Sequence, residues 1–247
     1  MTNPDKQKNR GMKLAESEVK MFAKEKNLKI FQPERVKDNF EFIDTIKDLN
    51  PDIICVVAYG KILPKEILDI PHLGCINLHA SLLPKYRGAA PIQWAVLNGD
   101  KVTGNSTMYM NERMDEGDII FQEKTEIGEY ETTGELWNRL KISGAELLSK
   151  TVREIEKGTA PRTPQGKYFT LAPMLNKEMA KIDFMQTATK IKNKVCGLNP
   201  IMGAYAMHND KKIKFWRVEV LDDECASQIL EKNFSEKIEP RRSNIIK

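Results

Sequence analysis

The sequence predicts an α/β fold built on a parallel, Rossmann-like sheet. Residues Asp52–Ala58 form a nearly uninterrupted apolar run, which is typical of a strand buried on both faces of a parallel sheet. A second strand pattern follows at Gly74–Ala80, and a long amphipathic helix is expected at Glu135–Lys157. Strands and helices that alternate at this spacing favour a sheet with helices packed against it.

The chain before the first of these strands predicts two helices and a short strand. Apolar residues recur at helical spacing from Leu14 to Ala23, and again over Phe42–Leu49 with charged residues between them. Leu28–Phe31 is a candidate strand, which Pro33 would end because proline cannot donate a hydrogen bond to a neighbouring strand.

Further elements are expected towards the C-terminus. Pro91–Leu97 has the pattern of a short helix, whereas Ser106–Met110 and Ile119–Gln122 have the patterns of strands. A later helix is expected over Met185–Lys194, and a later strand over Lys212–Val220. Too few residues then remain for a complete second core.

A linker divides the chain into a large and a small domain. The long helix is followed by Gly158, and the prolines at 161 and 164 come soon after it. We therefore place one domain at residues 1–160, the linker at 161–172 and a second domain at 173–247. The stretch Ser227–Lys247 is polar and poorly periodic, so we expect a disordered tail there.

The composition excludes some classes of protein. Of the 247 residues, 40% are hydrophobic and 30% are charged, and no stretch approaches the roughly 20 apolar residues that span a bilayer. The polar, basic start has no signal-peptide pattern, so a cytoplasmic location is expected. A net charge of +4 is too small to indicate nucleic-acid binding by itself. The four cysteines show no paired spacing, and with only three histidines we expect neither a metal site nor a disulfide framework.

Asn77 and His79 are the first candidate catalytic residues. They stand two positions apart in a predicted strand, so their side chains should point to the same face. An amide and an imidazole side by side can hydrogen-bond a developing oxyanion and shuttle a proton. The alternative is a half-buried strand whose polar pair is merely hydrogen-bonded within the protein.

Two neighbouring segments strengthen the catalytic interpretation. The segment Ser81–Pro84 leaves the end of the strand that carries Asn77 and His79, where ligands bind in open α/β sheets. Further on, Asp115 supplies a carboxylate that could orient His79. An ordinary solvated turn is the alternative for Asp115. No glycine-rich motif for cradling nucleotide phosphates occurs.

From Asn3 to about Val220, the sequence resembles the methionyl-tRNA formyltransferase family. Asn77, His79 and Asp115 match the Asn-x-His and Asp set of the folate-dependent formyltransferases, and Ser81–Pro84 matches their tetrahydrofolate-binding segment. Three further segments favour the branch that acts on tRNA: Tyr86–Gln93, the basic Asn3–Leu14, and Gly197–Tyr205, which departs from the family by having Ile201 and Met202 where Trp-Pro is usual.

The resemblance implies a reaction and a set of site residues. The amino group of initiator methionyl-tRNA would attack the formyl carbon of 10-formyltetrahydrofolate, with Asn77 and His79 holding the oxyanion and Asp115 paired with His79. The resemblance also implies that the folate is bound by Ser81, Leu82, Leu83 and Pro84, and that the tRNA is contacted by Lys6, Lys8, Arg10 and Lys13. It implies a monomer with no metal, and a C-terminal domain of partial β-barrel type.

Two other functions stay open from the sequence. One is a folate-dependent N-formyltransferase with a small amine acceptor, which shares the same catalytic set. The other is an inactive fragment, because family members begin with a strand, a helix and a second strand before the basic loop. Members also continue their barrel beyond the point, near Leu221, where the resemblance ends.

Overall fold

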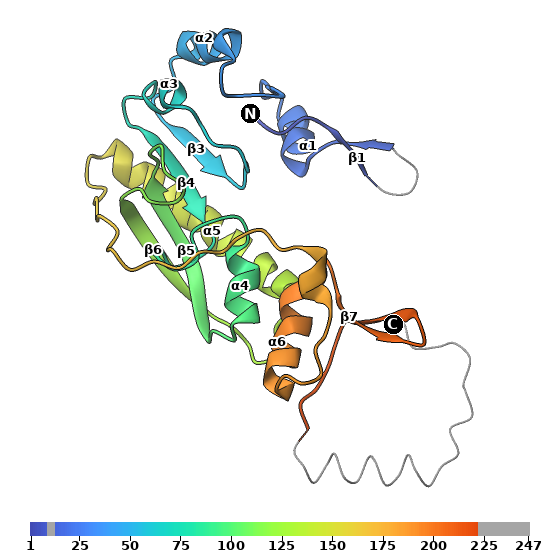
Figure 1. Cartoon of the computed structure of the whole chain (residues 1–247). Helices are drawn as coiled ribbons and strands as arrows, with labels where there is room; N and C mark the ends of the chain where they lie inside the picture. The colour runs from blue at the N-terminus through green and yellow to red at the C-terminus, as the bar shows by residue number, and fades with distance from the viewer. Residues whose placement is uncertain (9–12, 222–247) are drawn as a thin grey trace, which may run out of the picture.

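The computed structural model describes residues 1–8 and 13–221, and its central feature is a four-stranded sheet (Figure 1). The strands lie in the order β3 (Ile54–Val57), β4 (Cys75–His79), β5 (Val102–Tyr109) and β6 (Ile119–Glu126). β3 and β4 are parallel, whereas β5 is antiparallel to both β4 and β6. The predicted α/β class is confirmed, and the sheet is mixed, because parallel pairing among the described strands is confined to β3 and β4.

The long helix α5 (Thr133–Glu156) covers one face of this sheet and runs behind it in Figure 1. It begins at a capping box, in which the Thr132 side chain accepts from the Glu135 backbone and Glu135 accepts from the Thr132 backbone. A buried stripe at helical spacing then runs along it: Leu136, Leu140, Gly144, Leu147, Thr151 and Ile155. The helix predicted at Glu135–Lys157 is therefore confirmed.

On the opposite face, the edge of the sheet at β3 is covered by α2 (Phe40–Leu49) and α3 (Lys65–Leu68). The predicted amphipathic helix is α2, and its buried Phe42 and Ile43 pack in one cluster with the partly buried Ile54 of β3. We expected β3 to be buried on both faces, which is wrong. Cys55 and Val57 are exposed because β3 is the edge strand of the described sheet and only its Ile54 and Val56 face is covered.

The N-terminal segment differs from the predicted pattern. A helix was expected from Leu14, but Leu14 lies in β2 (Lys13–Ala15), which pairs with β1 (Lys6–Lys8), and α1 (Glu18–Glu25) begins only after its cap at Ser17. Ser17 accepts a hydrogen bond from the Lys20 backbone and so fixes the helix start. The expected strand at Leu28–Phe31 has no regular secondary structure instead. The Phe31 carbonyl oxygen accepts a hydrogen bond from the Thr2 backbone N–H.

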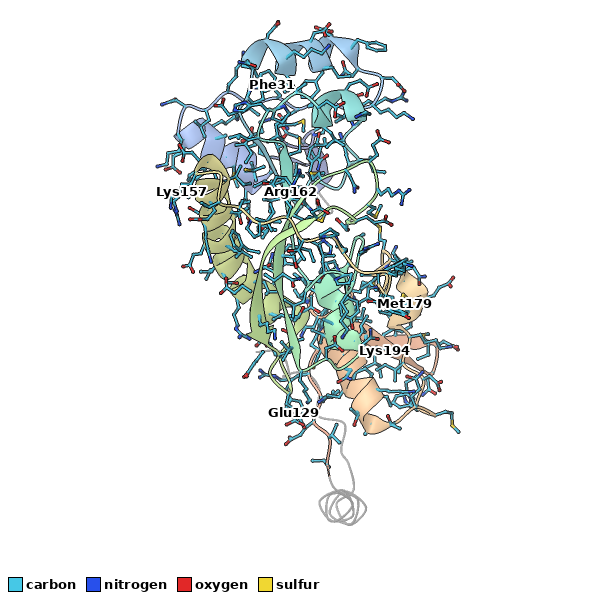
Figure 2. All side chains as sticks on the ribbon, turned by 90° about the vertical axis from the view of Figure 1, so that its left-hand side faces the viewer. Phe31, Glu129, Lys157, Arg162, Met179 and Lys194 are labelled. Carbon is cyan, nitrogen blue, oxygen red and sulfur yellow. The ribbon has the colours of Figure 1, made fainter. Side chains whose placement is uncertain are left out.

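The short helix predicted at Pro91–Leu97 is α4, with the same bounds. The helix expected over Met185–Lys194 is α6 (Ala188–Leu198), and the last predicted strand is β8 (Lys211–Phe215), which forms a hairpin with β7 (Ala204–His208). A short 3₁₀ helix, Lys177–Ala180, precedes α6. In Figure 2, Met179 and Lys194 lie at the end of the molecule opposite Phe31.

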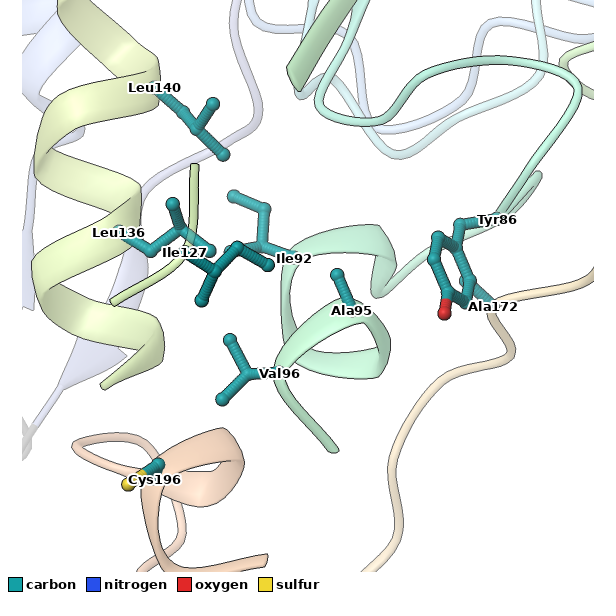
Figure 3. Close-up of a cluster of buried hydrophobic side chains, with 9 residues drawn as sticks. All are labelled: Tyr86, Ile92, Ala95, Val96, Ile127, Leu136, Leu140, Ala172 and Cys196. Atoms are coloured by element: carbon teal, nitrogen blue, oxygen red, sulfur yellow. The ribbon is translucent and has the colours of Figure 1, made fainter. Parts of the chain in front are cut away.

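The chain after α5 packs into the same core as the sheet domain. Ala172 of the linker and Cys196 of α6 belong to one buried cluster with Ile92 of α4 and Leu136 of α5 (Figure 3). The division into residues 1–160, 161–172 and 173–247 stays a prediction, and the expected tail at Ser227–Lys247 lies outside the described residues. Among the described helices, none is long and apolar enough to cross a membrane.

Gly104 tests how tightly β5 and β6 are packed. A Cβ atom at this position would lie 1.9 Å from the Glu123 carbonyl oxygen and 2.7 Å from Leu82 Cδ2, so the backbone of β6 would have to move. We expect Gly104→Ala to lower the free energy of unfolding by at least about 2 kcal/mol, measured by urea denaturation. Gly166→Ala is the matched control, because nothing lies within 4 Å of its added Cβ. Equal stability of the two variants would contradict this packing.

Candidate functional site

The structure brings Asn77, His79 and Asp115 together. Asn77 and His79 lie on β4 and face away from α5, since Ile76, the residue before Asn77, packs with Ile155 of that helix. Asn77 Nδ2 lies 3.5 Å from Asp115 Oδ1, and His79 Nδ1 lies 3.7 Å from Asp115 Oδ2. His79 is 6% exposed, so the three polar side chains meet where little water reaches the imidazole.

The hydrogen bond of His79 fixes its orientation. Nε2 lies 2.8 Å from the backbone carbonyl oxygen of Tyr86, which can only accept, so Nε2 carries a proton and donates it. Nδ1 then faces the Asp115 carboxylate. A second proton on Nδ1 would make the two side chains an ion pair, so Asp115 is placed to stabilise positive charge on the imidazole.

Asp115 is held in an uncommon backbone conformation. It lies in the turn between β5 and β6 with φ at +53°, in the left-handed region that aspartate tolerates better than most residues. Its Oδ2 also accepts a 2.8 Å hydrogen bond from the Gly88 backbone N–H, so the carboxylate joins the turn to the loop after β4. Gly88 is needed there, since its φ is +122° and an added Cβ would lie 2.8 Å from the Ala172 carbonyl oxygen.

The segment Ser81–Pro84 lies directly after His79 and is fixed by hydrogen bonds. Ser106 Oγ of β5 donates to the Ser81 carbonyl oxygen and accepts from the Leu83 backbone N–H. Gln122 Nε2 of β6 donates both to Ser106 Oγ and to the Leu83 carbonyl oxygen. Ser81 and Leu83 are buried, whereas Leu82 and Pro84 are half-buried, so the segment can offer a partner little more than the apolar surfaces of the latter two.

A second polar group adjoins this segment. The Tyr86 hydroxyl donates to Asp100 Oδ2 at 2.9 Å and accepts from Asn98. Burial raises the pKa of Tyr86, with the Asp100 hydrogen bond adding to the rise, so the phenol stays protonated near neutral pH. The Lys85 ammonium also donates to Asp100, and this hydrogen bond raises the pKa of Lys85. Both groups act as anchors for the loop after β4.

Two residues at the site were missed from the sequence. Arg87 is 6% exposed, and its guanidinium donates to Gln165 Oε1 of the linker and pairs with Glu116 at 3.2 Å. Gln165 Nε2 donates in turn to the Asp115 and Gly117 carbonyl oxygens. The position of Arg87, three residues after the Ser81–Pro84 segment, was a weak signal. Gln165 gave none, because it lies 50 residues beyond Asp115 and only the fold brings them together.

The basic residues of the N-terminal segment are only partly placed. Lys6 and Lys8 lie in β1 and Lys13 lies in β2, so these three are on one antiparallel hairpin, whereas Arg10 lies outside the described residues. The structure therefore brings the three lysines onto one hairpin.

One recess in the described part of the chain does not coincide with the polar cluster. It has a volume of about 1320 Å³ and is lined by residues 34–41 and 61–66 with Glu112. None of Asn77, His79 and Asp115 lines it. We therefore locate the candidate site by the convergence of these three side chains, which carries chemistry, and not by the recess, which is an open hollow beside α2 and α3.

The fold and this polar cluster define a class of protein. Residues 1–152 match the model of the formyl transferase family, and residues 174–237 match the model of the formyl transferase C-terminal domain. The chain belongs to the formyl transferase family. These matches confirm the predicted fold class, an α/β formyltransferase domain followed by the C-terminal domain of that family.

Curated relatives identify the branch that the chain most resembles. It is 50% identical to a methionyl-tRNA formyltransferase of Clostridioides difficile over 93% of this chain and 74% of that protein. It is 47% identical to a methionyl-tRNA formyltransferase of Caldanaerobacter subterraneus over 90% of this chain and 72% of that protein. The resemblance seen in the sequence is thereby confirmed.

Solved structures show the same fold at low identity. A 4-N formyltransferase from Francisella tularensis has a TM-score of 0.66 at 23% identity, covering 81% of this chain and 84% of that one. HypX from Aquifex aeolicus in complex with tetrahydrofolic acid has a TM-score of 0.62 at 17% identity, covering 71% of this chain and 30% of that one. At these identities the likeness is one of fold.

Ser106 tests how the segment after His79 is held. Its hydroxyl is fully buried, and removing it leaves the Leu83 N–H and the Ser81 carbonyl without that partner. Each buried polar group left unpaired costs roughly 1–3 kcal/mol, so we expect Ser106→Ala to lower the free energy of unfolding by about 3 kcal/mol. Ser149→Ala on the exposed face of α5 should leave it nearly unchanged. A Ser106→Ala protein as stable as the control would show that the hydroxyl does not hold this segment.

Proposed function

We propose that this chain transfers a formyl group from 10-formyltetrahydrofolate to the amino group of initiator methionyl-tRNA, a step of translation initiation. One observation carries the proposal. Asn77, His79 and Asp115 converge at the end of a central strand, in a chain that is 50% identical to a methionyl-tRNA formyltransferase. We also propose that the protein acts as a monomer, as the family resemblance implies.

The proposed chemistry gives each of the three side chains a role. The amine nitrogen attacks the formyl carbon, the carbonyl oxygen becomes an oxyanion, and the bond to the folate nitrogen then breaks. Asn77 Nδ2 and the His79 imidazole are the proposed oxyanion donors, and the Asp115 carboxylate is proposed to balance the charge on His79 and to help move the amine proton. Because His79 Nε2 donates to the Tyr86 carbonyl, an oxyanion using that proton would have to replace this contact.

We propose that Ser81, Leu82, Leu83 and Pro84 lie against the folate, as the family resemblance implies. The half-buried surfaces of Leu82 and Pro84 adjoin His79 in sequence and fit an apolar ring system better than a charged group. Since Ser81 and Leu83 are held by Ser106, the segment is fixed before a ligand binds. A fixed segment loses little conformational entropy on binding, which favours affinity.

The catalytic roles are tested by substitution. His79→Ala and Asn77→Ala should each lower kcat for formyl transfer to methionyl-tRNA by a factor on the order of 10² or more, because each removes help to the oxyanion or the proton. Asp115→Asn should do likewise while the unfolding midpoint is kept. His72→Ala is the matched control, since that imidazole is exposed and 3.7 Å from Asp52 in a surface loop.

Wild-type rates in all three variants would contradict the assignment. Transfer to a small amine but not to methionyl-tRNA would support the alternative acceptor. A folded protein with no transfer to either acceptor would support an inactive fragment.

We propose that Lys6, Lys8, Arg10 and Lys13 contact the tRNA, and Arg10 tests this partner. Phosphates attract such side chains, so Arg10→Ala should raise the KM for methionyl-tRNA, with a smaller effect on the KM for the folate, and should weaken the salt dependence of tRNA binding. Arg153→Ala removes the same charge from the exposed face of α5 and serves as the control. Equal tRNA affinities for Arg10→Ala and its parent would mean that this segment is simply a solvated basic stretch.

A further inference from the structure

We infer that Gln165 of the linker is a positioning residue that holds the Asp115 turn in the geometry needed for formyl transfer. The inference rests on the proposed function, since it assumes that Asp115 takes part in that reaction. It is carried by the hydrogen bonds of a single amide group, which joins three segments far apart in the sequence: the loop after β4, the turn between β5 and β6, and the linker.

The amide of Gln165 uses its full hydrogen-bonding capacity. Nε2 has two hydrogens and donates to the Asp115 carbonyl oxygen at 2.8 Å and to the Gly117 carbonyl oxygen at 2.9 Å. Oε1 has two lone pairs and accepts from Arg87 Nε at 3.0 Å and Nη2 at 2.7 Å. Turning the amide over would set its oxygen against two carbonyls and its nitrogen against a guanidinium. One orientation is therefore strongly preferred.

The turn between β5 and β6 has a backbone conformation that the hydrogen bonds from Gln165 would stabilise. Asp115 has φ at +53°, a backbone conformation that costs a non-glycine residue free energy and persists only where the surroundings impose it. The preceding residues 111–114 of the turn are exposed. The two hydrogen bonds from Gln165 span Asp115 to Gly117, so they fix the backbone from which the carboxylate reaches His79 and Asn77.

Arg87 is the anchor on the other side of the amide. Its guanidinium is buried, stacks 4.6 Å from the Phe169 ring and pairs with Glu116 in the same turn. A carboxylate at position 165 would satisfy Arg87 but would repel the Asp115 and Gly117 carbonyl oxygens. An apolar side chain would satisfy neither. An amide meets both requirements, because it accepts at one end and donates at the other.

The inference is tested with Gln165→Met, which keeps the length of the side chain and removes both kinds of hydrogen bond. Displacing a catalytic group by about 1 Å can cost on the order of 10² in rate, so we expect kcat with methionyl-tRNA to fall by roughly 10- to 100-fold. The KM values for both substrates should change little. Thr163→Val is the control, since Thr163 bonds Ile119 through its backbone and the variant should keep the wild-type kcat.

Two further variants separate positioning of Asp115 from general support of the linker. Gln165→Glu keeps the acceptor for Arg87 and loses the two donors, and we expect it to lose kcat as Gln165→Met does. In an Asp115→Ala background, Gln165→Met should add little to the loss already present, because both changes act on the same group. Wild-type kcat in Gln165→Glu, or fully additive losses in the double variant, would overturn the inference.

A measurement without turnover keeps the inference testable if the proposed function fails. The Gly88 N–H donates to Asp115 Oδ2, so its exchange with deuterium, followed by NMR, reports whether the carboxylate is in place. We expect faster exchange of this amide in Gln165→Met than in wild type or Thr163→Val. A wild type without formyl transfer refutes the proposed function, whereas unchanged Gly88 exchange in Gln165→Met refutes the positioning role.

Discussion

The site depends on how the central strand β4 uses its two faces. Alternate residues of a strand point to opposite sides, so Ile76 packs with Ile155 of α5 while Asn77 and His79 point the other way. β4 is bonded on both edges, in parallel to β3 and antiparallel to β5, which fixes its register against both neighbours. A slip of one residue would turn Ile76 to the polar side and His79 towards α5. Burial of the α5 face therefore holds the two polar side chains where they meet Asp115.

The interior beside β4 is polar as well as apolar, and the buried side chains of Asn105, Ser106 and Thr107 on β5 all have hydrogen-bond partners. Ser106 of β5 stands opposite His79 in the strand register and bonds the segment that follows His79. The hydroxyl oxygens of Thr107 on β5 and Thr151 on α5 are hydrogen-bonded at 2.8 Å, and Asn105 Nδ2 donates to the Leu140 carbonyl oxygen. Buried hydrogen bonds are directional, whereas apolar contacts are not. These pairs thus set the position of β5 against α5 and of the Ser81–Pro84 segment against β5 more closely than apolar packing alone would.

The sequence predicted elements well where local pattern and tertiary packing agree, as in α2, α4 and α5. The sequence-based predictions were wrong where contacts with other parts of the chain determine the burial or the secondary structure of a segment. β3 has an apolar run typical of a strand covered on both faces, yet Val57 is 51% exposed because the described chain covers only one face. Leu14 continues a helical pattern into α1, but pairing with β1 places it in a strand. Asn77 and His79 could be predicted because they stand two positions apart on one face of an expected strand, and because together with Asp115 they match a family motif.

Arg87 and Gln165 show why the rest of the site could not be predicted. A buried arginine is recognised only once its partners are known, and its partner Gln165 is 78 residues away along the chain. That partnership depends on the path of the linker. Thr163 forms backbone hydrogen bonds with Ile119 of β6, and Ala172 does so with Arg87 of the loop after β4. Gln165 lies between these two attachments, so the linker cannot move far from the Asp115 turn without breaking both. The sequence analysis placed the linker only as a boundary between two domains, whereas in the structure Gln165 of the linker is hydrogen-bonded to the Asp115 turn of the candidate site.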